Sequence, residues 1–220
     1  MRCRRVVMSS LALCLAISAV ALAQGAARKA HFGVLGGVAF DKPGGPDAAN
    51  INGTYTGFAV GGFVTFQVTH GFAIEPEALY VQKGAKTSTT GSSGTITGKI
   101  KVPYFEIPVL AKLRIPPRGG SIVSPHAYAG PAIAFKAGCH VSASSGTTTL
   151  SDSCDASTFN VKIKSTDFSL VFGGGVDIGR ALVHVRYDLG LSQIGNSGTN
   201  DNAKNRTLYL LAGWTFRAPH

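Results

Sequence analysis

Charged side chains recur at alternate positions in several stretches of this sequence, and the chemistry they could do is ion pairing. Glu75 and Glu77 are two residues apart, as are Lys112 and Arg114. In an extended strand, residues two apart point to the same side. An unpaired buried charge costs several kcal/mol, so charges on an enclosed face must find partners. We expect an internal ion-pair network of Glu75, Glu77, Glu106, Lys112, Arg114, His184, Arg186 and Asp188, with Tyr104 and Asp177 beside them.

Two other uses of these residues stay open, a narrow polar passage and catalysis. Hydrolytic chemistry would need a nucleophile, a base and an orienting acid. His184 would be the base and Ser169 or Ser192 the nucleophile, but the sequence contains neither G-x-S-x-G nor H-E-x-x-H. Four other histidines are scattered among expected turns and strand ends, namely His31, His70, His126 and His140. The sequence therefore predicts no enzyme, no metal site and no cofactor.

A second group of charges consists of basic residues near the expected long loops. Its members are Lys83, Lys86, Lys99, Lys101, Lys136, Lys162, Lys164, Lys204 and Arg206. Polybasic segments are attracted to anionic lipid surfaces by about 1 kcal/mol per charge. We expect this rim to face the phosphates of lipopolysaccharide, and the alternative is that these are ordinary solvated loop lysines.

Two cysteines remain once the N-terminal segment, which carries Cys3 and Cys14, is set aside. Cys139 and Cys154 would close a loop of 16 residues. In an oxidising compartment such a pair forms a disulfide, which for this loop length stabilises by roughly 3 kcal/mol. A metal pair is the rival interpretation, but no Cys-x-x-Cys spacing supports it.

Eight stretches have the composition of β-strands, being rich in Val, Phe, Tyr, Ile and Leu and bounded by turn residues. The expected strands are 30–40, 55–67, 72–83, 99–115, 122–137, 160–178, 181–194 and 206–217. In the last strand, Leu208, Leu210 and Trp214 share one face. In the strand before it, the apolar face is opposed by His184 and Arg186. A polar inner face with an apolar outer face is the pattern of a transmembrane β-barrel.

The connections between these strands alternate in length. They span 41–54, 68–71, 84–98, 116–121, 138–159, 179–180 and 195–205, which reads long, short, long, short, long, short, long. Outer-membrane barrels have short periplasmic turns and long external loops. The alternation therefore predicts an eight-stranded antiparallel up-and-down barrel with both ends of the chain on the periplasmic side.

The N-terminus reads as a secretory signal peptide. Arg2, Arg4 and Arg5 precede an apolar stretch at 11–22, and Ala21-Leu22-Ala23 is an A-x-A cleavage site. We expect residues 1–23 to be removed, leaving a barrel domain at 24–220. No later stretch is apolar over the 18 or more residues of a membrane-spanning helix. Only 15% of the residues are charged and 28 are glycine, an unusual mixture for a soluble domain.

The net charge of the whole chain is +10 and falls to about +7 without the signal peptide. A basic balance of this kind can indicate nucleic-acid binding. An exported chain meets little nucleic acid, so we expect acidic lipid headgroups as partners instead.

Four phrases in the mature part resemble the PorT-like outer-membrane β-barrel proteins. They are E-A-L-Y-V-Q-K-G at 77–84, Y-F-E-I-P-V-L-A-K at 104–112, Y-A-G-P at 128–131 and R-Y-D-L-G-L at 186–191. The resemblance covers nearly the whole mature chain, and the E-I-P strand is its most specific piece. One departure is that residues 217–220 follow Phe216, where such barrels often end at an aromatic residue.

The resemblance implies an outer-membrane location and, in some members, a link to protein secretion. The expected function is non-catalytic and concerns envelope integrity, surface interaction or protein export. We expect the protein to be a monomer. Expected partners are outer-membrane lipid, lipopolysaccharide and envelope or secretion-system proteins. A small pore or transporter is the alternative, and an enzyme that modifies lipid A comes third.

Overall fold

A computed structural model describes residues 30–45, 48, 52–92, 94–117, 119–154, 163–194 and 203–216 of the chain. The expected signal peptide at 1–23, its boundary with the domain at 24–220, Lys162 and the last four residues lie outside this part. Within the described residues, no helix has the length and hydrophobicity of a membrane span.

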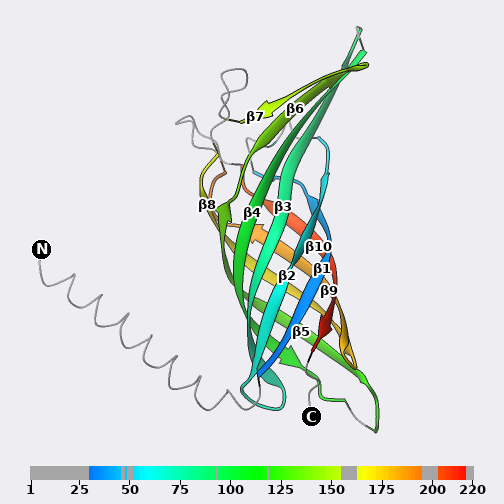
Figure 1. Cartoon of the computed structure of the whole chain (residues 1–220), viewed down its shortest axis with the longest axis vertical. Coiled ribbons are helices and arrows are strands. Elements are labelled where there is room, and N and C mark those ends of the chain that lie inside the picture. Colours follow the sequence, from blue (N-terminus) through cyan, green and yellow to red (C-terminus); the bar gives the residue numbers. More distant parts are fainter. Residues whose placement is uncertain are drawn as a thin grey trace, which may run out of the picture.

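Eight strands close into an antiparallel ring, which confirms the prediction from the eight strand-like stretches and their alternating connections (Figure 1). The ring strands are β1 (Ala30–Asp41), β2 (Tyr55–Gln67), β3 (Phe72–Gly91), β4 (Gly94–Arg114), β5 (Val123–Lys136), β8 (Thr166–Ile178), β9 (Ala181–Gly190) and β10 (Arg206–Thr215). Their order around the ring is β3-β2-β1-β10-β9-β8-β5-β4, and β4 pairs with β3 to close it. Because the number of strands is even, β1 begins and β10 ends beside the three short connections.

The two faces of the ring differ as the sequence pattern requires. Val60, Phe105 and Leu210 point outward and are 50%, 57% and 48% exposed. The intervening positions point inward, and Tyr209 and Leu211 on β10 are buried. Apolar side chains therefore cover the outside of the ring, which only a lipid environment makes favourable over this area.

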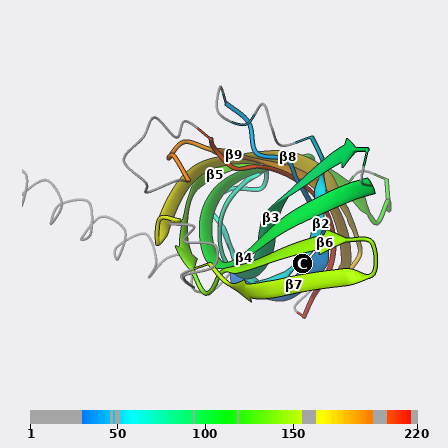
Figure 2. The same ribbon diagram turned by 90° about the horizontal axis from the view of Figure 1, so that it is seen from above.

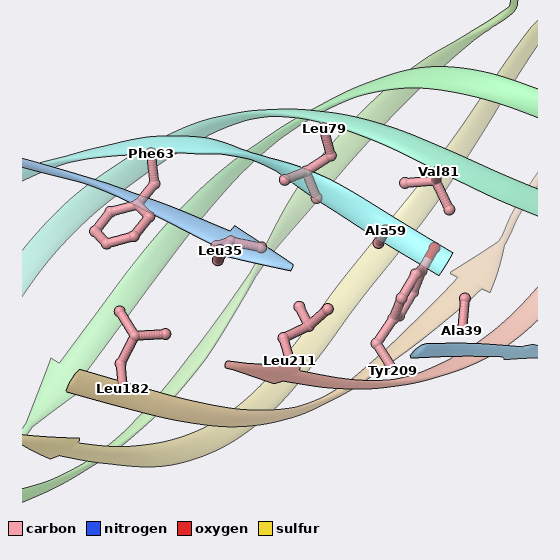
Figure 3. Packing of buried hydrophobic residues seen from close by; sticks show 9 residues of the cluster. All are labelled: Leu35, Ala39, Ala59, Phe63, Leu79, Val81, Leu182, Tyr209 and Leu211. Carbon is pink, nitrogen blue, oxygen red and sulfur yellow. The ribbon is translucent and has the colours of Figure 1, made fainter. Parts of the chain in front are cut away.

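Part of the interior is apolar (Figure 3). The cluster consists of Leu35, Ala39, Ala59, Phe63, Leu79, Val81, Leu182, Tyr209 and Leu211. These residues come from β1, β2, β3, β9 and β10. The rest of the interior carries the charged residues, and together the side chains fill a ring of this strand number.

The tightest of the short connections is the two-residue turn between β8 and β9. Ile178 pairs with Ala181, and Gly179 between them has a φ of 61°. Two-residue hairpins need a residue in this left-handed region at their first position, and glycine adopts it without steric cost. This turn fixes the register of β8 on β9, and with it the heights of Asp177 and His184.

Two of the long connections contain strands that the sequence analysis treated as loops. β3 continues to Gly91 and β4 starts at Gly94, so the expected loop at 84–98 is largely a paired hairpin. Its threonines are good strand formers. Hydroxyl groups also form hydrogen bonds across the two strands, between Ser88 and Thr97 at 3.3 Å and between Thr90 and Thr95 at 3.0 Å.

The connection at 138–159 holds a second hairpin, made of β6 (His140–Ser145) and β7 (Thr148–Ser153). β6 pairs with the upper part of β4, so β3, β4, β6 and β7 form one sheet that rises above the ring. Figure 2 shows these strands leaning over the opening of the barrel. We call this sheet the external sheet.

Several strand ends differ from the prediction. The expected strand 160–178 begins at Thr166 as β8. Residues 160–162 of the expected strand lie outside the described residues. β9 ends at Gly190 rather than 194, because its last residues leave the ladder to bond the loops. Ile194 N, for example, donates to the carbonyl oxygen of Ala203 at 2.9 Å.

Candidate functional site

An ion pair between Arg186 and Glu77 crosses the barrel interior. Arg186 Nη1 donates to Glu77 Oε2 at 2.7 Å, and Nη2 donates to Oε1 at 2.6 Å. Arg186 lies on β9 and Glu77 on β3, which are four strands apart in both directions around the ring. The pair therefore joins opposite walls of the barrel, and both side chains are almost fully buried. The ring of Tyr128 supports the guanidinium, with 5.3 Å between the ring centre and Cζ.

Nearer the short-turn end, Lys112 pairs with Glu75. Lys112 Nζ lies 3.2 Å from Glu75 Oε2, and the Thr65 hydroxyl donates to the same oxygen at 2.5 Å. Arg114 donates to Gln67 at 3.2 Å and lies 3.8 Å from Asp177 Oδ2.

Lys83 is a correction to the sequence analysis, which placed it on the external rim. It is 1% exposed, and its Nζ lies 2.9 Å from Glu106 Oε2 and 2.5 Å from Asp188 Oδ2. Asp188 is on β9, so this lysine makes a second connection between opposite walls. The prediction failed because β3 runs on to Gly91, so Lys83 is not at a strand end.

Two aspartates close the external end of the interior, and the sequence analysis missed both. Asp41 accepts hydrogen bonds from Gly84 N at 2.8 Å and the Thr207 hydroxyl at 3.0 Å. Asp167 accepts from the Ser192 hydroxyl and from Asn205 Nδ2, both at 2.7 Å. The signal for Asp41 was available, because it continues the inward alternation of Leu35 and Ala39 along β1.

The structure brings His184 beside His126, a residue that the sequence predicts among turns and strand ends. Their ring centres are 4.7 Å apart. Neither candidate nucleophile is near His184. Ser169 pairs with Gly190, six residues farther along β9, a separation of roughly 20 Å. Ser192 bonds Asp167 instead. The described residues thus contain no serine–histidine pair at His184.

The predicted rim divides into outward and inward residues. Lys86, Lys99, Lys101 and Arg206 lie on the outward face, and Lys42 joins them. We call these five residues the cationic band. Lys136 instead turns toward the loops and donates to the carbonyl oxygen of Ile163 at 3.0 Å, while Lys164 and Lys204 are half-buried.

Like charges face each other directly within the cationic band. Lys86 is the cross-strand partner of Lys99. Lys42 N donates to the carbonyl oxygen of Arg206 at 3.0 Å, which makes those two residues neighbours as well. Among the described residues, no member of the band forms an ion pair. Like charges directly opposite each other are destabilising, so an anion placed between them would be stabilised.

The band begins where the apolar outer surface stops. On β4 the outward positions change from Ile107 and Phe105 to Lys101 and Lys99. Phe105 packs against Tyr80 with ring centres 5.6 Å apart. Aromatic residues form girdles at the membrane interfaces of outer-membrane barrels, and the band lies farther toward the external end than these aromatic residues.

The predicted disulfide between Cys139 and Cys154 is present, with 5.4 Å between the two Cα atoms. It joins the residue before β6 to the residue after β7. Both cysteines are buried against Val102, Tyr104 and Val141. The bridge therefore anchors the base of the β6–β7 hairpin to the top of the barrel.

Residues 22–196 match the model of the outer membrane protein beta-barrel domain family. The match covers most of the chain, and the chain belongs to this family. Together with the closed ring and its apolar outer face, this makes it an integral protein of the outer membrane.

Solved structures of small outer-membrane barrels are similar at low identity. The attachment invasion locus protein Ail of Yersinia pestis, in complex with the heparin analogue sucrose octasulfate, is 18% identical, with a TM-score of 0.44, covering 85% of this chain and 99% of Ail. Neisserial surface protein A is 16% identical, with a TM-score of 0.44, covering 84% and 97%. OprG of Pseudomonas aeruginosa is 18% identical, with a TM-score of 0.44, covering 86% and 96%. The comparison with curated proteins finds no match.

Proposed function

We propose that this protein is a non-catalytic outer-membrane protein that holds lipopolysaccharide phosphates on its cationic band and presents the external sheet at the cell surface. The observation that carries the proposal is the pair of opposed lysines, Lys86 and Lys99, on the same outward face as Tyr80 and Phe105 and six residues nearer the external end. Phosphate groups of the outer leaflet would lie at this height, and they would relieve the repulsion between the lysines.

The interior supports a barrel that does not conduct. The Arg186–Glu77 pair and the Lys83–Asp188 pair both join opposite walls, and the apolar cluster fills much of the remaining space. A continuous water path would have to break these buried pairs. We therefore favour a role at the envelope surface over the pore or transporter, and over catalysis on lipid A, for which the described residues offer no serine–histidine pair at His184.

The finer resemblance to PorT-like barrels would add a role in protein export. It stays a prediction, because the family match concerns the outer-membrane barrel domain in general. Protein partners in the envelope would contact the external sheet, whose edge strand β7 is exposed along its whole length.

The proposal is tested by measuring lipopolysaccharide binding to the purified protein in detergent micelles. Replacing Lys86, Lys99 and Lys101 together by glutamine should weaken binding by about 100-fold, since each charge contributes about 1 kcal/mol. The matched control is Arg180→Gln, which removes an exposed cation at the opposite end of the barrel and is compared with the single variant Lys99→Gln. The control variant should bind like the wild type.

Two results would overturn the proposal. One is a triple variant that binds lipopolysaccharide as tightly as the wild type. The other is equal binding of lipopolysaccharide whose phosphates have been removed enzymatically.

A further inference from the structure

Two buried histidines and an aspartate face one another inside the barrel, near its periplasmic end. His126 lies on β5, His184 on β9 and Asp177 on β8 between them. One nitrogen of each ring and one carboxylate oxygen lie within 4.8 Å of one another. The histidines are 6% and 1% exposed, so they are separated from bulk water.

The imidazole nitrogens of these histidines have no hydrogen-bond partner among the described residues. His126 Nδ1 lies 3.5 Å from Asp177 Oδ2 without forming a hydrogen bond. A buried polar atom left without a partner costs about 1–3 kcal/mol. The other three imidazole nitrogens have neither an ion-pair nor a hydrogen-bond partner among the described residues, so they are free to act as ligands.

A glycine makes the close approach of the two rings possible. Gly175 is the cross-strand neighbour of both His126 and His184, so all three lie side by side on the inner wall. A Cβ at this position would lie 2.8 Å from His184 Cδ2 and 3.1 Å from His126 Nε2. The same Cβ would also overlap the carbonyl oxygen of Val183, so any other residue at 175 would displace the backbone of β9 as well as the two imidazoles.

Asp177 lies near two cations, and each of them has a closer partner. Lys112 lies 4.0 Å from Asp177 Oδ1, but its closer partner is Glu75 at 3.2 Å. Arg114 lies 3.8 Å from Asp177 and donates a hydrogen bond to Gln67 at 3.2 Å. If Asp177 turned toward a metal ion, Lys112 would keep its ion pair with Glu75 and Arg114 would keep its hydrogen bond to Gln67.

The aspartate of the site borders a cavity at the short-turn end of the barrel. Asp177 lines a cavity of about 40 Å³ whose walls include Lys112, Arg114 and Gly179, the last of these in the periplasmic turn between β8 and β9. A cavity of this size holds water. Water and a small ion could therefore reach the aspartate from the periplasmic end.

We propose that His126, His184 and Asp177 bind a divalent transition-metal ion of the Zn²⁺ class. Neutral imidazole is the preferred nitrogen ligand of such ions, and two imidazoles with one carboxylate are a common protein ligand set. Three protein ligands leave a fourth position for a water molecule from the cavity. In a tetrahedral zinc site the ligand atoms are roughly 3.3 Å apart, so the side chains must close by about 1.5 Å around the ion.

The first experiment uses the wild-type protein, folded in detergent micelles and freed of metal, with Zn²⁺ as the probe in a calorimetric titration. We expect one ion per barrel. Co²⁺ substituted for Zn²⁺ should give the visible absorption bands of a tetrahedral site with nitrogen and oxygen ligands. Absence of stoichiometric Zn²⁺ binding to the folded wild type would overturn the proposal.

The second experiment compares variants whose folding is checked by their migration in unheated gels. His184→Gln or Asp177→Asn should weaken Zn²⁺ binding by at least about 100-fold, because even groups outside the ligand set contribute about 10- to 100-fold. Gly175→Ala should also weaken it. His140→Gln, which changes an exposed histidine at the external end, is the matched control and should bind like the wild type.

An alternative site would be revealed by the same variants. If folded His126→Gln and His184→Gln proteins keep the wild-type affinity for Zn²⁺, the ion binds elsewhere and the assignment is wrong. Because no residue of the cationic band takes part, this outcome is independent of lipopolysaccharide binding.

Discussion

At the scale of single residues, burial decides what each lysine does. Lys83 and Lys99 differ little in sequence context, since each lies in a long strand near the external end. Lys83 points inward and is surrounded by Glu106 and Asp188, whereas Lys99 points outward with no ion-pair partner among the described residues. The direction of the side chain, set by the two-residue period of the strand, separates a structural cation from a binding cation.

Lys83→Met should destabilise the folded barrel by about 3–5 kcal/mol, because it leaves two buried carboxylates without their cation. Lys99→Met, the matched control, should change stability by no more than about 0.5 kcal/mol. Both can be measured by urea unfolding in lipid vesicles, followed by the fluorescence of Trp214, the single tryptophan. Equal stabilities of the two variants would contradict the buried position of Lys83.

At the scale of elements, the external sheet depends on contacts that the barrel ladder does not provide. Among the described strands β7 pairs only with β6, and β6 pairs with the end of β4 that has left the ring. The disulfide between Cys139 and Cys154 fixes both ends of this hairpin to the apolar residues at the top of the barrel. Because β6 and β7 lie outside the closed ring, the hairpin should be able to open without unfolding of the ring once the disulfide is removed.

Replacing Cys139 and Cys154 by serine should loosen β6 and β7 while the barrel remains folded. A bridge closing a loop of this length stabilises by roughly 3 kcal/mol. Limited proteolysis should cut the double variant within 140–153 faster than the oxidised wild type, while both keep the gel migration of a folded barrel. Reduced wild type should behave like the variant. Loss of the whole barrel on reduction would show that the bridge holds the ring as well.

At the scale of the whole molecule, the interior connects opposite walls. Glu77 and Arg186 are 109 residues apart in sequence and bond each other across the ring. Lys83 and Asp188 repeat this connection nearer the external end. Two such connections and an apolar cluster occupy much of the barrel interior, in keeping with the width of an eight-stranded ring.

The purified protein in a planar bilayer should therefore show no steady aqueous conductance. The reason is that the ion pairs would have to separate in a medium of low dielectric before a continuous water path could form. Single-channel recording at several voltages checks this. A large, constant open level present in every insertion would refute the filled interior and restore the pore interpretation.

The sequence by itself determined which face of each strand meets lipid. Alternation along β9 and β10 separates apolar from polar positions, and because the strand period is two, this pattern identifies the outer surface without knowledge of the fold. The alternation of long and short connections gave the strand number and the end at which the chain starts. The Ser/Thr-rich connections were less informative, because hydroxyl residues suit both loops and paired hairpins.

Only the tertiary structure decided which residues meet inside. Which strands lie opposite each other depends on ring closure, and the height at which two side chains meet depends on the register of every ladder between them. The sequence showed that Glu77 and Arg186 both point inward, but only the closed ring makes them partners. The same applies to His126 and His184, which come together because two ladders bring them to either side of Gly175.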